Sequence, residues 1–243
     1  MSGVLRINVW SGPRNISTAL MYCFAQRADT RVVVEPLYAH YLSHSSAHEY
    51  HPGADEVLRS QDNDGEAVVR DVILGPCDRP VLFLKQMTHH LIELNLDFLT
   101  ETTNIILTRD PTDMLPSYQQ QVATPTLTDT GYPQHHELLT HLHAMGQKPV
   151  ILDSRETLRK PRAVLRQLCD HMGLDFDEGM LQWAAGPRPE DGVWARHWYA
   201  SVHRSTGFAA YRPKSEPFPE KLQSLLEQCR PLYEQLAAEA LRG

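Results

Sequence analysis

The chain has 243 residues, 42% of them hydrophobic, which is enough to bury one sizeable core. Its formal net charge is −7 with no long basic run, which argues against a nucleic-acid partner. No apolar run approaches the roughly 20 residues that cross a bilayer, and no signal-peptide core opens the chain. Four widely separated cysteines indicate neither a disulfide framework nor a thiolate zinc site. We therefore expect a cytoplasmic protein without a membrane partner.

A strand, a tight turn and a helix start open the chain. The strand-like run from Leu5 to Val9 breaks at Ser11-Gly12-Pro13, and a helical pattern covers about Ser17 to Ala28. Such a turn directs several backbone N–H groups and the positive end of a helix dipole at one point. The pattern predicts an anion site, although an ordinary strand-to-helix turn is the simpler interpretation.

This turn departs from the phosphate loop of nucleoside triphosphatases. Gly12 fits that motif, but Thr18 stands at the position of its lysine and Ala19 at that of its magnesium-binding hydroxyl. Magnesium–ATP chemistry is therefore poorly supported, and the cation is instead Arg14, inside the turn.

Further apolar strands alternate with helices along the chain. This alternation predicts an α/β fold with a mostly parallel five-stranded sheet, in which ligands bind at the carboxyl ends of the strands. The later strands are expected at Arg31 to Val34, Val81 to Lys85, Asn104 to Arg109 and Pro149 to Asp153. Helices are expected at Pro36 to Leu42, after Asp110, and at Pro161 to Met172, Asp177 to Trp183 and Glu220 to Arg242.

We expect a single domain over residues 1–243. Residues 43–64 are polar and contain Pro52 and Gly53, so this stretch, the main part of an excursion over residues 43–75, is expected to have little regular structure. Residues 218–242 form a C-terminal helical segment. The excursion and residues 124–143 are expected to line an acceptor pocket.

A second anion site is indicated where the fourth strand ends. Arg109 closes that strand, and Ser117 follows eight residues later on the next helix, so both can converge on one further phosphate. A helix-capping salt bridge between Arg109 and Asp110 is the alternative.

Three segments of the chain carry a resemblance to a known family. Arg14-Asn15-Ile16-Ser17-Thr18-Ala19-Leu20 resembles the 5′-phosphosulfate loop of sulfotransferases that use 3′-phosphoadenylyl sulfate. Arg109 to Tyr118 resembles their 3′-phosphate motif, and Glu35-Pro36 is similar to the Glu-Pro of the bacterial trehalose-sulfotransferase branch. Residues Asp153 to Leu181 also look like the family's late helical segment.

The resemblance implies a three-layer α/β/α, P-loop-like sulfotransferase fold and metal-independent transfer of a sulfuryl group to a small-molecule acceptor. It implies Glu35 as the catalytic base and Arg14 as the cation at the bridging oxygen, with Lys85 as a second cation and His89 or His90 as a reserve base. Co-substrate binding falls to Gly12, Pro13, Arg14, Asn15, Ile16, Ser17, Thr18, Arg109, Ser117, Arg204 and Ser205.

Simpler interpretations stay open for several of these residues. Glu35 can merely start a helix, and Lys85 can extend from a buried strand. Ile16 replaces the family's usual glycine, so the turn must manage with a negative φ there. Arg204 and Ser205 can form a surface turn, and Trp194, Trp198 and Tyr199 can be core residues.

Histidines at positions 40, 44, 48 and 51 share a helical spacing. The neighbouring Pro52-Gly53 makes a stable helix doubtful, so we expect a solvated or acceptor-facing stripe with no metal. His135, His136, His141 and His143 are expected on the surface of a helix.

Two rival functions remain at this stage. One is a nucleotide kinase or hydrolase of the same fold, which magnesium dependence would reveal. The other is a non-catalytic nucleotide-binding module, in which replacing Glu35 would change no activity. The acceptor and the oligomeric state stay open, a homodimer included.

Overall fold

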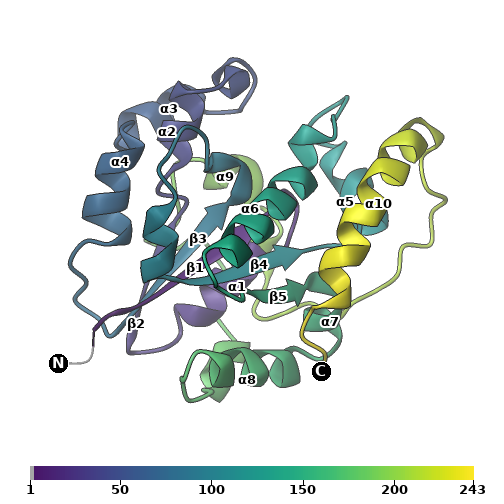
Figure 1. Ribbon diagram of the computed structural model, residues 1–243. Helices are drawn as coiled ribbons and strands as arrows, with labels where there is room; N and C mark the ends of the chain where they lie inside the picture. The colour runs from purple at the N-terminus through teal and green to yellow at the C-terminus, as the bar shows by residue number, and fades with distance from the viewer. Residues whose placement is uncertain (1–2) are drawn as a thin grey trace. The chain divides into compact units, whose positions relative to one another are not determined.

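The computed structural model describes residues 3–243 (Figure 1). Five strands form one parallel sheet in the order β2-β3-β1-β4-β5, which confirms the predicted α/β class. The strands are β1 Leu5–Ser11, β2 Thr30–Val34, β3 Val81–Met87, β4 Thr103–Thr108 and β5 Val150–Asp153. Burial explains why the sequence predicted them, because Ile105, Ile106 and Leu107 have no exposed surface, as is usual in a parallel sheet covered on both faces.

The chain divides into two compact units, and each is described by itself. Unit 1 comprises the start of the chain up to Val9, Ser17–Asn104 and Asp177–Gly207. Unit 2 comprises Trp10–Ile16, Ile105–Phe176 and Phe208–Gly243. The expectation of a single domain over 1–243 stays a prediction.

Unit 1 pairs β2 with β3 in parallel register. Val34 lies opposite Lys85 in this pairing, so Glu35, the next residue, emerges at the strand ends beside that lysine. The helices of the unit are α1 Ser17–Phe24, α2 Tyr38–Ser43, α3 Ala54–Ser60, α4 Gly65–Val68 and α9 Ala195–Trp198. Shorter helical turns cover Ser46–Glu49, Val69–Ile73, Thr88–His90, Asp97–Glu101, Glu178–Leu181 and Val202–Arg204.

Two sequence predictions for unit 1 were wrong. Residues 43–75 were expected to have little regular structure, but they contain α3, α4 and two further helical turns. Local caps explain α4, because the Asp64 side chain accepts hydrogen bonds from the backbone N–H groups of Glu66 and Ala67. The helix expected at Asp177 to Trp183 is a single tight turn over Glu178–Leu181.

Unit 2 pairs β4 with β5 in parallel. Thr108 lies opposite Asp153, so Arg109 and Ser154 both leave the sheet at the carboxyl ends of their strands. The helices of the unit are α5 Pro111–Tyr118, α6 Tyr132–Ala144, α7 Ser154–Arg159, α8 Pro161–His171 and α10 Gln223–Ala238, with short turns at Thr128–Thr130 and Glu220–Leu222.

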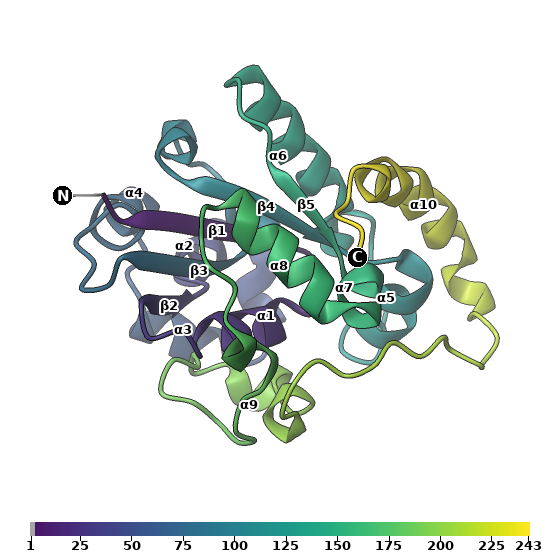
Figure 2. The ribbon, with the colours of Figure 1, turned by 90° about the horizontal axis from the view of Figure 1, so that it is seen from below.

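An apolar cluster holds α10 in place within unit 2. The last helix, yellow in Figures 1 and 2, lies beside α5 and α6. Each fully buried leucine of such a cluster contributes roughly 1.5–3 kcal/mol to stability. The buried members are Met114, Leu115, Tyr118, Tyr132, Leu222, Leu225, Leu226 and Cys229.

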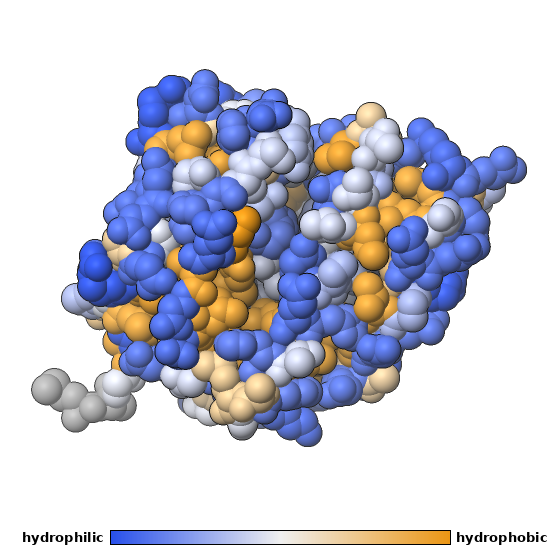
Figure 3. Space-filling model, turned by 45° about the horizontal axis from the view of Figure 1, so that its top comes forward, coloured by the Kyte–Doolittle hydropathy of each residue, from blue (hydrophilic) through white to orange (hydrophobic). Residues whose placement is uncertain are grey.

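The surface drawn in Figure 3 is mostly hydrophilic, with hydrophobic residues in smaller areas between the polar ones. Within residues 3–243, no helix combines the length and apolar character that crossing a bilayer requires.

Candidate functional site

The turn after β1 is pressed closely against the segment that precedes α6. A Cβ atom at Gly12 would lie 2.9 Å from the carbonyl oxygen of Thr130, so no other residue fits there without a shift. Gly131, at φ +80°, makes the approach from the other side, since its own Cβ would meet the Gly12 Cα at 3.2 Å. Within unit 2, the turn is therefore held against this segment by close backbone contact.

Arg14 and Arg109 come together at this turn. The Nε of Arg14 donates to the Ser117 hydroxyl at 3.2 Å, and Nη1 of Arg109 donates to the Arg14 carbonyl at 2.5 Å. Burial and then the neighbouring Arg109 charge lower the pKa of Arg14, and burial lowers the pKa of Arg109 as well. Two guanidinium groups held close together against their mutual repulsion are an arrangement suited to binding an anion.

Asn15 fixes the turn to the sheet. Its Nδ2 donates to the Leu107 carbonyl at 2.8 Å, and its Oδ1 accepts from the Ile16 N–H at 2.9 Å and from the Ser154 hydroxyl. The left-handed residue of the turn is Arg14, at φ +53°, whereas Ile16 keeps a negative φ as its side chain requires. The loop thus forms without the glycine that the resemblance leads one to expect.

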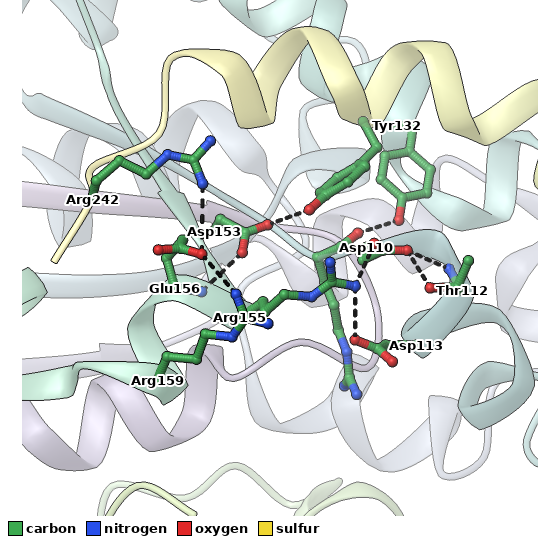
Figure 4. Close-up of polar contacts among 11 residues, drawn as sticks. Asp110, Thr112, Asp113, Tyr132, Asp153, Arg155, Glu156, Arg159 and Arg242 are labelled. Carbon is green, nitrogen blue, oxygen red and sulfur yellow. Dashed lines mark hydrogen bonds and ion pairs between the residues drawn. The ribbon is translucent and has the colours of Figure 1, made fainter. Parts of the chain in front are cut away.

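Next to Arg109 in the sequence, Asp110 belongs to a network of carboxylates around Arg155 (Figure 4). Asp110 caps α5 by accepting from the Thr112 N–H at 2.8 Å, and the same side chain binds Arg155 at 2.5 Å. Arg155 also lies 3.6 Å from Asp113. Although burial opposes it, the carboxylate of Asp110 raises the pKa of Arg155. Arg155 thus neutralises much of the negative charge around Arg109, and the predicted Arg109–Asp110 salt bridge is replaced by this pairing.

Another segment of unit 2, residues 211–214, was not singled out from the sequence, and it packs against Arg155 and Arg159. The Tyr211 ring packs against Arg155 and Arg159, with guanidinium carbons 5.3 and 5.1 Å from its centroid. Partial burial and then the Arg109 charge lower the pKa of Lys214, three residues further on. The basic-aromatic run from Tyr211 to Lys214 was the available signal.

Unit 1 contains the other group of predicted residues. Glu35 and Lys85 form a buried ion pair, with side chains 8% and 3% exposed. The backbone of Glu35 adopts φ +41° and is held on both sides, because its N–H donates to the Lys85 carbonyl at 2.7 Å and its carbonyl accepts from Gln61 at 3.0 Å. Glu35 is therefore a positioned carboxylate, and Lys85 is its partner.

Two histidines follow β3. His90 is buried and stacks between Tyr38 and Tyr41, at centroid distances of 4.9 and 4.8 Å. Burial lowers the pKa of His90 well below its usual value, so the ring is neutral at pH 7. His89 is half-buried and packs edge-on against Tyr41 at 4.9 Å.

The other loop and tail residues fall in unit 1. Ser17 is buried and Thr18 half-buried at the start of α1. Arg204 is exposed. The Ser205 hydroxyl accepts from the Trp183 Nε1 at 3.1 Å and donates to the Val202 carbonyl at 2.7 Å, so it is engaged in local structure. The role of Arg204 and Ser205 in binding stays a prediction.

The predicted histidine patterns need correction. His40 is 3% exposed and bonds to the Ile92 carbonyl at 2.7 Å, whereas His44 and His48 are exposed, so the four histidines do not share one face. No group of three potential ligands for a metal occurs among the described residues. His135 lies inside unit 2 and is 1% exposed, because its face of α6 packs below Gly12; burial lowers its pKa to about 3.

Comparisons with known proteins give the chain a family context. Residues 5–240 match the sulfotransferase domain family. Two curated proteins of Arabidopsis thaliana, branched-chain-amino-acid aminotransferase-like proteins 2 and 1, are each 41% identical over 228 residues. The aligned region covers 93% of this chain but 40% of each relative, so the chain spans about two fifths of their length.

Solved structures resemble the chain over nearly its whole length. The sulfotransferase domain from the curacin biosynthetic pathway has a TM-score of 0.59 at 16% identity and covers 99% of this chain and 100% of its own. The sulfotransferase from Alicyclobacillus acidocaldarius has a TM-score of 0.55 at 12% identity, with 98% and 96% covered. These likenesses concern the fold.

Proposed function

We propose, from the premise that this chain belongs to the sulfotransferase domain family, that it transfers a sulfuryl group from 3′-phosphoadenylyl sulfate to a hydroxyl or amine of a small acceptor. The observation that carries the choice of donor is the assembly of Arg14, Ser117 and Arg109 in unit 2. These side chains are bonded into one cationic group, which suits a ligand that carries two phosphates.

The donor-binding roles follow from this assembly. Arg109 and Ser117 receive the 3′-phosphate, with Lys214 as an additional cation beside Arg109. The backbone from Gly12 to Ile16 receives the 5′-phosphosulfate, and the Ser17 and Thr18 hydroxyls continue this loop along the chain. Thr18 and Ala19 stand where magnesium–ATP enzymes carry lysine and a hydroxyl, so the residues favour transfer without a metal.

The chemical step uses the buried pair of unit 1. The Glu35 carboxylate accepts the proton of the acceptor hydroxyl while the acceptor oxygen bonds to sulfur. The bond between sulfur and the bridging oxygen breaks, and its electron pair leaves with adenosine 3′,5′-bisphosphate. The Arg14 guanidinium stabilises the charge that builds on the departing phosphate, and the Lys85 ammonium balances the charge of Glu35. His89 is the reserve base.

Calorimetric titration tests the donor. With EDTA present, adenosine 3′,5′-bisphosphate is expected to bind, and ATP to bind at least tenfold more weakly. Arg109→Ala should lower the affinity for the bisphosphate by at least tenfold, because a charge-assisted contact is lost. Arg162→Ala, on the exposed side of α8 in the same unit, is the matched control and should change nothing.

Two outcomes would redirect the assignment. Tighter binding of ATP that requires magnesium would favour a kinase or hydrolase. Bisphosphate binding with no sulfuryl transfer, in water or to any acceptor of a hydroxyl and amine panel, and with Glu35→Gln indistinguishable from wild type, would favour a binding module.

A further inference from the structure

Tyr199 is a buried tyrosine whose hydroxyl makes no hydrogen bond of full geometry within residues 3–243. It follows α9, and its backbone is satisfied, because its N–H donates to the Ala195 carbonyl at 2.8 Å and its carbonyl accepts from the His203 N–H at 2.9 Å. The side chain is 4% exposed. Its hydroxyl is shielded from solvent and has no hydrogen-bond partner among residues 3–243.

The Tyr199 side chain lies near the two residues of unit 1 that are proposed to act in the chemical step, Lys85 and Glu35. The Lys85 ammonium lies 5.9 Å from the centroid of the Tyr199 ring, and Lys85 carries Glu35 as its ion-pair partner. The side chains of Thr18 and Trp194 interact with the phenol oxygen and lower its pKa, but the hydroxyl meets the full geometry of a hydrogen bond with neither of them. The Trp194 indole N–H is likewise buried without a partner.

A second buried tyrosine of unit 1 shows what a structural role requires. The Tyr22 hydroxyl donates to the Asp191 carboxylate, at 2.7 and 2.9 Å from its two oxygens. A buried hydroxyl without such a partner costs about 1–3 kcal/mol, and native structures retain few of them without a reason. The hydroxyl of Tyr199 is therefore available to a ligand, while that of Tyr22 is not.

We propose that the Tyr199 hydroxyl is a hydrogen-bond donor to a non-bridging oxygen of the sulfuryl group. This assignment rests on the proposed function, in which Glu35 and Lys85 of the same unit act in the transfer of the sulfuryl group. Burial and then the negative charge of Glu35 raise the pKa of Tyr199 well above its usual value, so the phenol keeps its proton. The phenol therefore donates a hydrogen bond but does not give up its proton. The proton of the acceptor hydroxyl goes to Glu35.

The test compares two nucleotides that differ only by the sulfuryl group. Tyr199→Phe removes one oxygen and keeps the ring against Lys85. Its affinity for 3′-phosphoadenylyl sulfate should fall about tenfold in calorimetry, whereas its affinity for adenosine 3′,5′-bisphosphate should stay within twofold of wild type. Its urea midpoint should stay the same or rise, because an unpaired hydroxyl has been removed from the interior.

Tyr22→Phe is the matched control and should behave in the opposite way. It should lower the urea midpoint, because the Asp191 carboxylate loses a donor, and it should leave the ratio of the two nucleotide affinities unchanged. A Tyr199→Phe protein with a wild-type ratio would overturn the assignment alone. So would loss of the native circular dichroism spectrum, because the oxygen would then be structural. A wild-type protein that binds neither nucleotide would overturn the proposed donor, and this assignment with it.

Discussion

Two residues assigned to the chemistry share an unusual backbone conformation. Within residues 3–243, Arg14, Glu35 and Glu93 are the non-glycine residues with positive φ. A side chain held in the left-handed region costs on the order of 1 kcal/mol or more, and such positions gather at functional sites. The backbone carbonyls of Arg14 and Glu35 each accept a hydrogen bond, from Arg109 and Gln61 respectively. These bonds hold the strained backbone at two positions that carry a charged side chain.

At the same scale, the buried pair of Glu35 and Lys85 predicts a specific pattern of stability. Glu35→Gln leaves the Lys85 ammonium, 3% exposed, without a charged partner, and should lower the free energy of unfolding by about 3 kcal/mol. Lys85→Met should lower the free energy of unfolding by a similar amount, because it leaves the buried Glu35 carboxylate without a charged partner. The double variant should recover most of the loss, because neither charge then remains, but it should not transfer sulfate. Urea unfolding measures all three.

The exposed pair of Arg70 and Asp71 provides the control. Their side chains are 68% and 62% exposed, so Asp71→Ala should leave the urea midpoint nearly unchanged. Additive losses in the double variant of Glu35 and Lys85 would contradict the interpretation of the two residues as one coupled pair.

At the scale of elements, the segment between Gly207 and α10 is expected to complete the 3′-phosphate site. The Tyr211 ring packs against Arg155, and the Arg109 charge, after burial, lowers the pKa of Lys214. Lys214→Ala should weaken binding of adenosine 3′,5′-bisphosphate about tenfold, because one charge-assisted contact is lost. It should leave adenosine 5′-phosphate, which lacks the 3′-phosphate, unaffected. Arg212→Ala, an exposed cation two residues away, is the control. Equal losses for both nucleotides would place Lys214 elsewhere.

The strands could be predicted because β2 to β5 each contain a short, continuous apolar run, whereas β1 alternates apolar residues with Arg6 and Asn8. Their order along the chain brought Arg109 and Ser117 to the end of β4, and the turn at Gly12 could be located from its glycine and proline. Fine geometry was harder to predict. The left-handed residue is Arg14, which no pattern indicates, because contacts from Arg109 and Asn15 set the shape of that turn.

Long-range packing decided what the sequence could not show. Residues 43–75 are polar, yet they form short helices through local caps and contacts with the rest of unit 1. The sequence pattern assigns His135 to the polar surface of α6, but its side chain packs against Gly12, more than 100 residues earlier in the chain. Lys214 in unit 2 and Tyr199 in unit 1 come from late segments without a motif, so only the folded chain shows that Arg109 lowers the pKa of Lys214 and that Lys85 lies over the Tyr199 ring.

For the whole molecule, the net charge of −7 makes the local arrangement of cations decisive. An acidic protein repels a nucleotide that carries several negative charges, and the Debye length of about 8 Å at physiological salt limits that repulsion to short range. Arg14 and Arg109 therefore act at contact distance, and Arg155 keeps the nearby carboxylates of Asp110 and Asp113 from cancelling them.

The path of the chain predicts how the molecule unfolds. Neither compact unit is one continuous segment, because the chain passes from one to the other after Val9, Ile16, Asn104, Phe176 and Gly207. The first and third of these crossings fall within β1 and β4, so each of those strands contributes residues to both units. Loss of either strand removes structure from both, and we expect a single cooperative transition in urea.

Two buried thiols report on the units separately. Cys23 lies in unit 1 and Cys229 in unit 2, and both side chains have no exposed surface. Single-cysteine variants that retain one or the other should become reactive to a thiol reagent at the same urea concentration, within about 0.3 M, and this should coincide with the loss of helical circular dichroism. Addition of adenosine 3′,5′-bisphosphate at 100 times its dissociation constant should shift both midpoints together, since binding to the folded protein at that ratio adds about 2.7 kcal/mol. Midpoints that separate, or a ligand that shifts only one of them, would show that the units unfold independently.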